Sequence, residues 1–406
     1  MKRLLWSCTL SLLVVATLGA ATSSLTPQGS TALTSYLREA IAGGAVPGAV
    51  VAVVNGNGVI YHEAFGRSST LRDTPMAKDT IFNLASMTKP VTSVAIMMLV
   101  EEGKIRLDDD VAKFLPKYKN LSVISKFNEA DASYETRPAK RPITIRQLLT
   151  HTSGFGYAFA NPIAAKIAAK TGKSELDLPL LFDPGESWAY GPSTRVLGDV
   201  VEAVSGQKLD AFLESRILRP LGMRDTSYLV AAANYPRVVG VAARGADGKF
   251  VERPMPATLP ASVAGDGGLY STAGDYAQFL RMLLNGGRVG QTRLLTEKSV
   301  HAMFETQTGK VVVQPMHSTN QALSKDFPLG ANEDTWGLGF QLAKAAHPNM
   351  RTPGSGTWAG IFNTHFFVDP ARGLGVIVMM QTLPFYDEAS MKVYAGVEEA
   401  IYRNLK

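Results

Sequence analysis

The stretch Phe82-Asn83-Leu84-Ala85-Ser86-Met87-Thr88-Lys89-Pro90 decides the fold assignment, because it places a serine three residues before a lysine where a helix begins. Residues 91–102 are mostly apolar and end at Gly103, a pattern typical of a buried helix with a C-terminal stop. Side chains three residues apart share one face of a helix. We therefore expect the Ser86 hydroxyl and the Lys89 amine to lie side by side.

This pairing suits acyl transfer. A serine hydroxyl is a poor nucleophile until a neighbouring base takes its proton, and a lysine can be that base once burial or nearby cations favour its neutral form. The helix N-terminus adds backbone N–H groups that favour negative charge beside Ser86. Alone the pattern is weak, since an N-cap serine followed by a chance lysine also explains it. A second such pattern, Ser205-Gly206-Gln207-Lys208, contains a glycine between two helix-like segments, so we interpret it as a turn.

The composition indicates a globular protein of two lobes. The chain has 406 residues, of which 46% are hydrophobic and 19% charged, enough to bury a sizeable core. The net charge of +6 comes from scattered basic residues, which is typical of a solvated surface. We therefore expect a small-molecule substrate and no nucleic acid, and the sequence gives no indication of the oligomeric state.

The first 21 residues have the pattern of a cleavable secretory signal. Lys2 and Arg3 precede an apolar run over 4–18, which is too short to span a bilayer. We predict export to the periplasm or the medium, without stable membrane insertion. Cys8 precedes most of the apolar run, which argues against a lipid anchor. It is also the single cysteine, so the mature chain should contain no disulfide.

Strand-like patterns occur near both ends of the chain. Residues 48–54 and 59–65 are apolar runs on either side of Asn55-Gly56-Asn57-Gly58, which predicts a β-hairpin. Further strands are expected at 336–342, 360–368 and 374–380, and helices at 30–42, 272–284, 297–304 and 390–403.

The middle of the chain differs, with helical segments at 145–149, 196–204 and 209–218 and no clear strand pairs. We predict an α+β fold, an antiparallel sheet flanked by helices. Residues 22–104 and 266–406 would form the sheet lobe, and residues 105–265 an inserted all-helical lobe. A cleft between two lobes is a usual place for a functional site.

A second stretch, Asp183-Pro184-Gly185-Glu186-Ser187-Trp188-Ala189-Tyr190-Gly191-Pro192-Ser193, lies in the inserted lobe. A phenol beside a lysine ammonium loses its proton more readily, which makes Tyr190 a candidate general base for Ser86 and acid for the leaving group. The alternative is that Tyr190 only packs its loop together with Trp188.

Together with Leu148-Leu149-Thr150-His151-Thr152-Ser153-Gly154, Arg219-Pro220-Leu221-Gly222-Met223 and Gly265-Asp266-Gly267-Gly268-Leu269, these stretches resemble the serine hydrolases of the class C β-lactamase superfamily, most closely its family VIII carboxylesterases. The resemblance covers most of the mature chain in the family's order. It implies a β-lactamase or penicillin-binding-protein-like fold and an acyl-enzyme on Ser86. Lys89 and Tyr190 would share the proton transfers, and which of them is the base stays open.

The resemblance also implies a third motif on a strand beside the serine. Lys170-Thr171-Gly172 matches the β-lactamase form literally, but it ends an alanine-rich helix and precedes Tyr190, so we set it aside. Counting back from the strand end at Asp369-Pro370 gives Trp358-Ala359-Gly360, which is similar to the Trp-x-Gly form of the esterases. These three residues would contact substrate, and the backbone N–H groups of Ser86 and Ile361 would form the oxyanion hole.

Two departures from the β-lactamase pattern favour esters. Pro192 replaces an asparagine that contacts the lysine and the substrate amide, and Trp358 replaces a lysine or histidine that holds a substrate carboxylate. We therefore predict a serine carboxylesterase acting on short acyl chains. The alternatives are a β-lactamase, D-amino-acid peptidase or acyltransferase on the same scaffold, and a non-catalytic penicillin-binding-like sensor.

Other candidate sites are weaker. His151 could line the cleft and contact substrate, or it could be a loop histidine bonded to backbone. Asp266 is expected to shape a turn beside the site. His62-Glu63 lacks the second histidine of a zinc motif, so we expect no metal and no cofactor. No Gly-x-Ser-x-Gly motif is present, which argues against an α/β-hydrolase triad.

Overall fold

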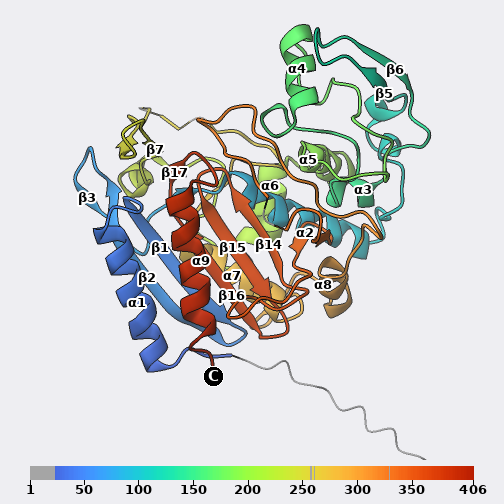
Figure 1. Cartoon of the computed structure of the whole chain (residues 1–406). Coiled ribbons are helices and arrows are strands. Elements are labelled where there is room, and N and C mark those ends of the chain that lie inside the picture. Colours follow the sequence, from blue (N-terminus) through green and yellow to red (C-terminus); the bar gives the residue numbers. More distant parts are fainter. Residues whose placement is uncertain (1–22, 257, 260, 329) are drawn as a thin grey trace, which may run out of the picture.

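A computed structural model describes residues 23–256, 258–259, 261–328 and 330–406. The signal peptide predicted for residues 1–21 lies outside the described residues. An antiparallel sheet of eight strands forms the centre of the molecule (Figure 1). Its order is β12 (Thr335–Trp336), β13 (Gln341–Leu342), β14 (Gly356–Gly360), β15 (Thr364–Asp369), β16 (Leu374–Met379), β1 (Gly48–Asn55), β2 (Gly58–Ser69) and β3 (Thr74–Pro75).

The pairing of β1 with β16 joins the two ends of the chain in one sheet, with a register that runs from Val50 opposite Met379 to Asn55 opposite Leu374. Every residue of β1 is buried. Val50, Ala52 and Val54 point into the core on one side, and the residues between them into the core on the other side. A strand covered on both faces needs this uninterrupted apolar run. The predicted fold class, an antiparallel sheet flanked by helices, is confirmed.

Helices cover both faces of the sheet (Figure 1). α1 (Pro27–Ala42) and α9 (Glu388–Tyr402) pack together on one face. The other face is covered by α7 (Ala273–Leu284) and by α2 (Thr88–Glu101), which is almost wholly buried. A short helix, α8 (Glu297–Met303), and the hairpin of β10 (Arg288–Val289) and β11 (Thr292–Arg293) follow α7.

Besides several short 3-10 turns, the inserted lobe carries helical segments of five residues or more. These are α3 (Ile145–Leu149), α4 (Pro162–Thr171), α5 (Ser193–Ser205), α6 (Leu209–Leu213) and the π-helical continuation of α6, η5 (Glu214–Leu218). Of these, α5, α6 and η5 contact α2. The expectation of an all-helical lobe without strand pairs is wrong, because β5 (Ser122–Phe127) and β6 (Tyr134–Pro138) form an antiparallel hairpin beside α4 (Figure 1). β5 has one buried residue, Val123, and β6 has none, so the hairpin lacks the buried apolar run that would have revealed it.

Two further elements differ from the sequence-based expectation. Residues 242–252, assigned to the inserted lobe, contact the sheet lobe instead: β7 (Ala242–Arg244) pairs with β8 (Phe250–Glu252) and, in parallel, with β17 (Thr382–Leu383). The strand expected at 336–342 is a tight hairpin of β12 and β13. Its turn contains Gly339 at φ +101°, a conformation that favours glycine.

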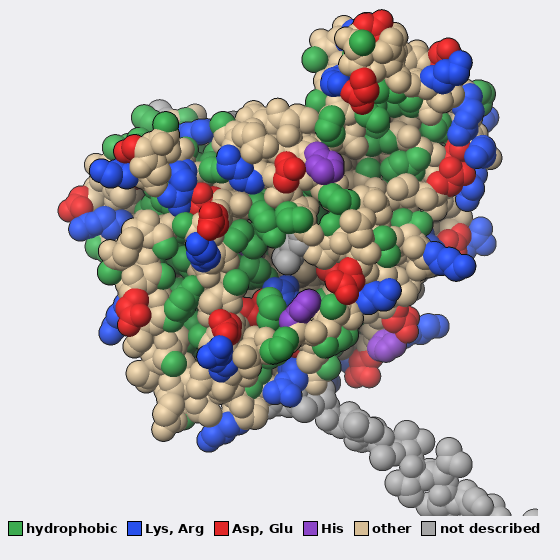
Figure 2. Space-filling view, in the orientation of Figure 1, with side chains coloured by type: hydrophobic (Ala, Val, Ile, Leu, Met, Phe, Trp, Pro, Cys, Tyr) green, Lys and Arg blue, Asp and Glu red, His purple; other side chains and the backbone are tan. Residues whose placement is uncertain are grey.

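The surface shows no concentration of one charge on the face in view. Figure 2 shows lysine, arginine, aspartate and glutamate side chains interspersed over it and over the protruding tip of the inserted lobe. In the described part of the chain, none of the helices combines the length and the apolar character needed to cross a membrane.

Candidate active site

Ser86 sits on a strained turn that leads into α2. β4 (Phe82–Asn83) pairs with β9 (Tyr270–Ser271), and the Leu84 N–H donates to the Leu269 carbonyl at 2.9 Å. The chain then turns sharply at Ala85, whose φ of +44° is unusual for a residue other than glycine. The Asn83 side chain accepts a hydrogen bond from the Ala85 N–H at 2.9 Å and holds this turn. Ser86 follows in the short helix η1 (Ala85–Met87) that opens onto α2.

Lys89 lies one turn further along, with its side chain buried against Ser86. Its Nζ donates to Ser86 Oγ at 3.0 Å and to the backbone carbonyl of Asp266 at 2.7 Å. The ammonium also lies over the rings of Tyr157, 5.3 Å from the centroid, and Tyr190, at 5.0 Å. The expected juxtaposition of hydroxyl and amine on one helix face is therefore present.

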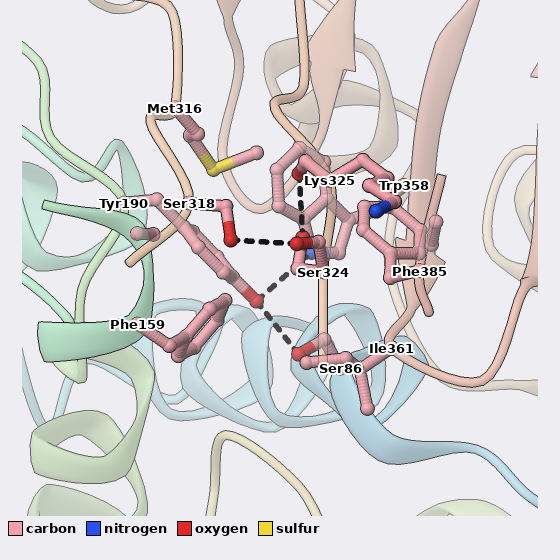
Figure 3. Close-up of a pocket in the computed structure, with 12 residues that line it drawn as sticks. Ser86, Phe159, Tyr190, Met316, Ser318, Ser324, Lys325, Trp358, Ile361 and Phe385 are labelled. Atoms are coloured by element: carbon pink, nitrogen blue, oxygen red, sulfur yellow. Dashed lines mark hydrogen bonds between the residues drawn. The ribbon is translucent and has the colours of Figure 1, made fainter. Parts of the chain in front are cut away.

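Tyr190 approaches the serine from the inserted lobe (Figure 3). Its hydroxyl donates to Ser86 Oγ at 2.6 Å, and Trp358 Nε1 donates to the Tyr190 hydroxyl at 3.4 Å. Its ring packs between the rings of His151 and Trp358, with centroids 5.2 and 4.9 Å away. The structure thus brings Ser86, Lys89 and Tyr190 into direct contact, and their catalytic roles stay predictions.

The strand of the expected third motif, β14, runs beside the serine turn. A Cβ at Gly360 would lie 2.3 Å from the Leu84 carbonyl oxygen, so only glycine allows this close approach. Ile361, directly after the strand, lines the same cavity as Ser86. This placement is compatible with an oxyanion hole formed by the N–H groups of Ser86 and Ile361, and that role stays a prediction.

A cavity of about 380 Å³, partly open to solvent, lies in front of Ser86. Figure 3 shows Tyr190, Trp358, Met316 and Ser318 around this cavity, with Ser86 below them. Five of its lining residues were predicted from the sequence: Ser86, Tyr190, Trp358, Ala359 and Ile361. The others, which were not predicted, are Phe159, Ala160, Met316, Ser318, Ser324, Lys325 and Phe385.

The missed residues 316–325 belong to one connection between α8 and β12. The Ser318 hydroxyl donates to the Ser324 carbonyl at 2.6 Å, and Thr319 donates from its N–H to the Phe159 carbonyl at 3.1 Å. The segment therefore crosses from the sheet lobe to the inserted lobe over the cavity. It has no apolar periodicity, so nothing in its sequence indicated a role at the site.

Two predicted substrate contacts lie away from the cavity surface. His151 is buried behind Tyr190, with its ring 5.1 Å from that of Trp336, and it does not line the cavity. Burial, and then the charge of Lys89, lower the pKa of His151 well below its usual value, so the ring is neutral at neutral pH. Gly360 packs on the backbone of Leu84. Both residues support the site from behind.

The two motif matches that we set aside, Lys170-Thr171-Gly172 and Ser205-Gly206-Gln207-Lys208, lie at helix ends as expected. Lys170-Thr171-Gly172 ends α4, where Gly172 at φ +67° caps the helix. In the second Ser-x-x-Lys pattern, the Ser205 hydroxyl donates to the Val201 carbonyl at 2.6 Å, and Lys208 pairs with Glu202 at 3.2 Å. Among residues 23–406, apart from the three internal gaps, no group of three or more His, Cys, Asp or Glu side chains is placed to hold a metal ion.

Comparison with known proteins agrees with the motifs. The chain is 32% identical to protein Rv1367c of Mycobacterium tuberculosis, with 89% of this chain and 92% of that protein covered. It is 30% identical to lovastatin esterase of Penicillium rubens, with 90% and 96% covered. A crystal structure of simvastatin synthase LovD from Aspergillus terreus, a mutant form, superposes with a TM-score of 0.79 at 27% identity over 93% of this chain and 98% of that one.

The family's sequence model, described as Beta-lactamase, matches residues 33–399, which include the serine turn, the Tyr190 loop and β14. The resemblance seen in the motifs is confirmed, and the chain belongs to the beta-lactamase family.

Proposed function

We propose that this beta-lactamase-fold hydrolase cleaves carboxylic esters with short acyl chains through an acyl-enzyme on Ser86. The observation that carries the proposal is the contact of Ser86 Oγ with Lys89 Nζ at 3.0 Å and with the Tyr190 hydroxyl at 2.6 Å. A serine held this way has two groups able to take its proton as it attacks. The esterase named among its relatives supports the same reaction class.

The proposed reaction has two stages. Ser86 Oγ attacks the ester carbonyl carbon, and its proton passes to Lys89 or Tyr190. The oxyanion that forms accepts hydrogen bonds from the N–H groups of Ser86 and Ile361. As the intermediate collapses, the leaving alkoxide takes the proton and departs as an alcohol. Water then attacks the acyl-enzyme and releases the acid, and an alcohol in place of water would give acyl transfer.

The cavity supports an apolar, short acyl group. Phe159, Met316 and Phe385 contribute apolar side chains to its lining, and the enclosed space in front of Ser86 is small. A long acyl chain would have to leave this space and extend into solvent. The acyl group therefore fits best when it has only a few carbons.

Ester cleavage is favoured over β-lactam cleavage by the residues that replace the β-lactamase ones. Pro192 caps α5 without an amide side chain, and Trp358 presents an indole where a carboxylate-binding cation would be expected. β-lactam hydrolysis is the second candidate, because the cavity lining includes Lys325, whose ammonium could attract a substrate carboxylate.

A panel of substrates tests the choice between these reactions. Among p-nitrophenyl acetate, butyrate, octanoate and palmitate, kcat/KM should be greatest for acetate or butyrate and at least about 100-fold lower for palmitate, a difference within what pocket contacts achieve. Nitrocefin should be turned over more slowly than butyrate. Faster turnover of nitrocefin would favour the β-lactamase, and a preference for palmitate would contradict the short acyl pocket.

Export is a separate proposal. It depends on residues 1–21, which lie outside the described residues, and on the pattern of charge, apolar run and small residues found there. Small esters present outside the cytoplasm would then be the enzyme's substrates.

A further inference from the structure

A carboxylate lies directly behind the proposed catalytic residues, and the proposed mechanism does not use it. Asp266 is buried, 5% exposed, and its backbone carbonyl accepts a hydrogen bond from Lys89 Nζ at 2.7 Å. Its side chain accepts one hydrogen bond from the Tyr157 hydroxyl and another from Arg195 Nε at 3.1 Å. The sequence analysis assigned Asp266 only to a turn, and the structure shows a full set of polar partners.

The turn that carries Asp266 is fixed between two helices. The Gly265 carbonyl accepts from the Thr92 hydroxyl of α2 at 2.7 Å. On the other side, a Cβ at Gly265 would lie 2.3 Å from the Thr194 carbonyl of α5, so the turn fits closely against this helix. Asp266 therefore has little freedom to move relative to Lys89.

Tyr157 links Asp266 to Tyr190. Its N–H donates to the Tyr190 carbonyl at 3.0 Å, and the two rings pack edge to face with centroids 4.9 Å apart. Burial, and then the negative charge of Asp266, raise the pKa of Tyr157 well above its usual value. Tyr157 thus keeps its proton and stays a donor to Asp266, which leaves Tyr190 as the tyrosine that serves Ser86.

Asp266 also supplies the negative charge next to Lys89. In the described part of the chain, the ammonium contacts a hydroxyl, a backbone carbonyl and two aromatic rings, all of them neutral groups. Burial opposes ionisation of Asp266, yet the charge of Lys89, the phenol hydrogen bond and Arg195 hold its pKa below the usual value. Asp266 is therefore ionised at neutral pH.

We propose, on the basis of the proposed function, that Asp266 is a positioning residue that balances the charge of Lys89 and anchors Tyr190 through Tyr157. Arg195, whose side chain is 44% exposed, forms an ion pair with Asp266 and partly offsets its negative charge. Asp266 and Arg195 together set the local charge around Ser86, and with it the pH dependence of the attack by Ser86.

In the described part of the chain, few other titratable groups lie near Lys89 and Asp266. Glu175 lies nearby and accepts a hydrogen bond from the Ala158 N–H at 2.8 Å. Burial raises the pKa of Glu175, and burial lowers that of His151. Among the described residues, the titratable groups that face Lys89 or Asp266 from the packed elements are Tyr157, Tyr190, His151, Glu175, Arg195 and Tyr228.

Two substitutions should move the pH profile in opposite directions. In Asp266→Asn, loss of the negative charge makes the surroundings of Ser86 more positive and favours the deprotonated, reactive state of the site, so the acid limb of kcat/KM for p-nitrophenyl butyrate should move to lower pH by at least about half a unit. In Arg195→Gln, the charge of Asp266 is no longer opposed, so the limb should move to higher pH. A purely structural role would lower kcat/KM at every pH without opposite shifts.

Asp199→Asn is the matched control, because Asp199 lies on α5 as Arg195 does, but pairs with Lys117 on the outer surface, 41% exposed. Its profile should match the wild type. If the wild type is active and its acid limb coincides with those of Asp266→Asn and Arg195→Gln, this inference is overturned and the proposed function still stands. A wild type that neither cleaves esters nor reacts with a fluorophosphonate overturns both. If Asp266→Asn does not fold, the direction of the Arg195→Gln shift decides.

Discussion

Replacing Ser86 with alanine is expected to lower kcat for p-nitrophenyl butyrate by about ten-thousandfold or more, because no acyl-enzyme can form without the nucleophile. The side chain accepts hydrogen bonds from Lys89 Nζ and the Tyr190 hydroxyl, and alanine leaves space for a water to replace it. The fold should survive, as circular dichroism and the thermal midpoint would show. Steady-state kinetics on the purified variant gives the measurement.

The chain contains its own control for this substitution. Ser205 belongs to the second Ser-x-x-Lys pattern, at the end of α5, where its hydroxyl bonds to a backbone carbonyl of the same helix. Ser205→Ala should keep wild-type kcat and KM. Full activity in Ser86→Ala, with the loss appearing in Ser205→Ala, would assign the chemistry to the other serine.

The second large effect is expected for Tyr190→Phe, which should lower kcat by about 10² to 10⁴-fold, the usual contribution of a general acid or base. The substitution removes the hydroxyl that lies 2.6 Å from Ser86 Oγ. The ring keeps its packing against His151 and Trp358, so KM should change little. Steady-state kinetics with p-nitrophenyl butyrate, which gives kcat and KM separately, tests whether kcat falls while KM stays nearly unchanged.

Tyr157→Phe is the matched comparison, since the ring of Tyr157 also lies against the Lys89 ammonium. Its hydroxyl, however, bonds to Asp266 and not to Ser86. Its loss of kcat should therefore be at least about tenfold smaller than that of Tyr190→Phe, in line with an indirect role. Equal losses would mean that the hydroxyl of Tyr190 has no special part in proton transfer.

Much of the fold and of the site could be predicted because local patterns carried the information. The uninterrupted apolar run of β1 and the glycine turn after it specified a hairpin whose first strand is buried on both faces. The spacing of Ser86 and Lys89 on one helix fixed their contact regardless of the rest of the chain. The contact of Tyr190 with Ser86 bridges two lobes, and only the family resemblance pointed to it.

The remainder could not be predicted because it depends on tertiary contacts. The hairpin of β5 and β6 has a single buried residue, so it has no sustained apolar periodicity. The connection that carries Met316 and Ser318 forms part of the cavity through single hydrogen bonds to the inserted lobe. The role proposed for Asp266 depends on Tyr157, 109 positions away in the sequence, and a glycine-rich turn alone does not reveal it.

The most direct test of the central claim, that Lys89 and Tyr190 activate Ser86, is the intact mass of the protein after reaction with a fluorophosphonate. The account predicts a single adduct on the wild type, mapped to Ser86 by peptide analysis, no adduct on Ser86→Ala, and much slower labelling of Tyr190→Phe. An unlabelled wild type, or an adduct on a residue other than Ser86, would contradict it.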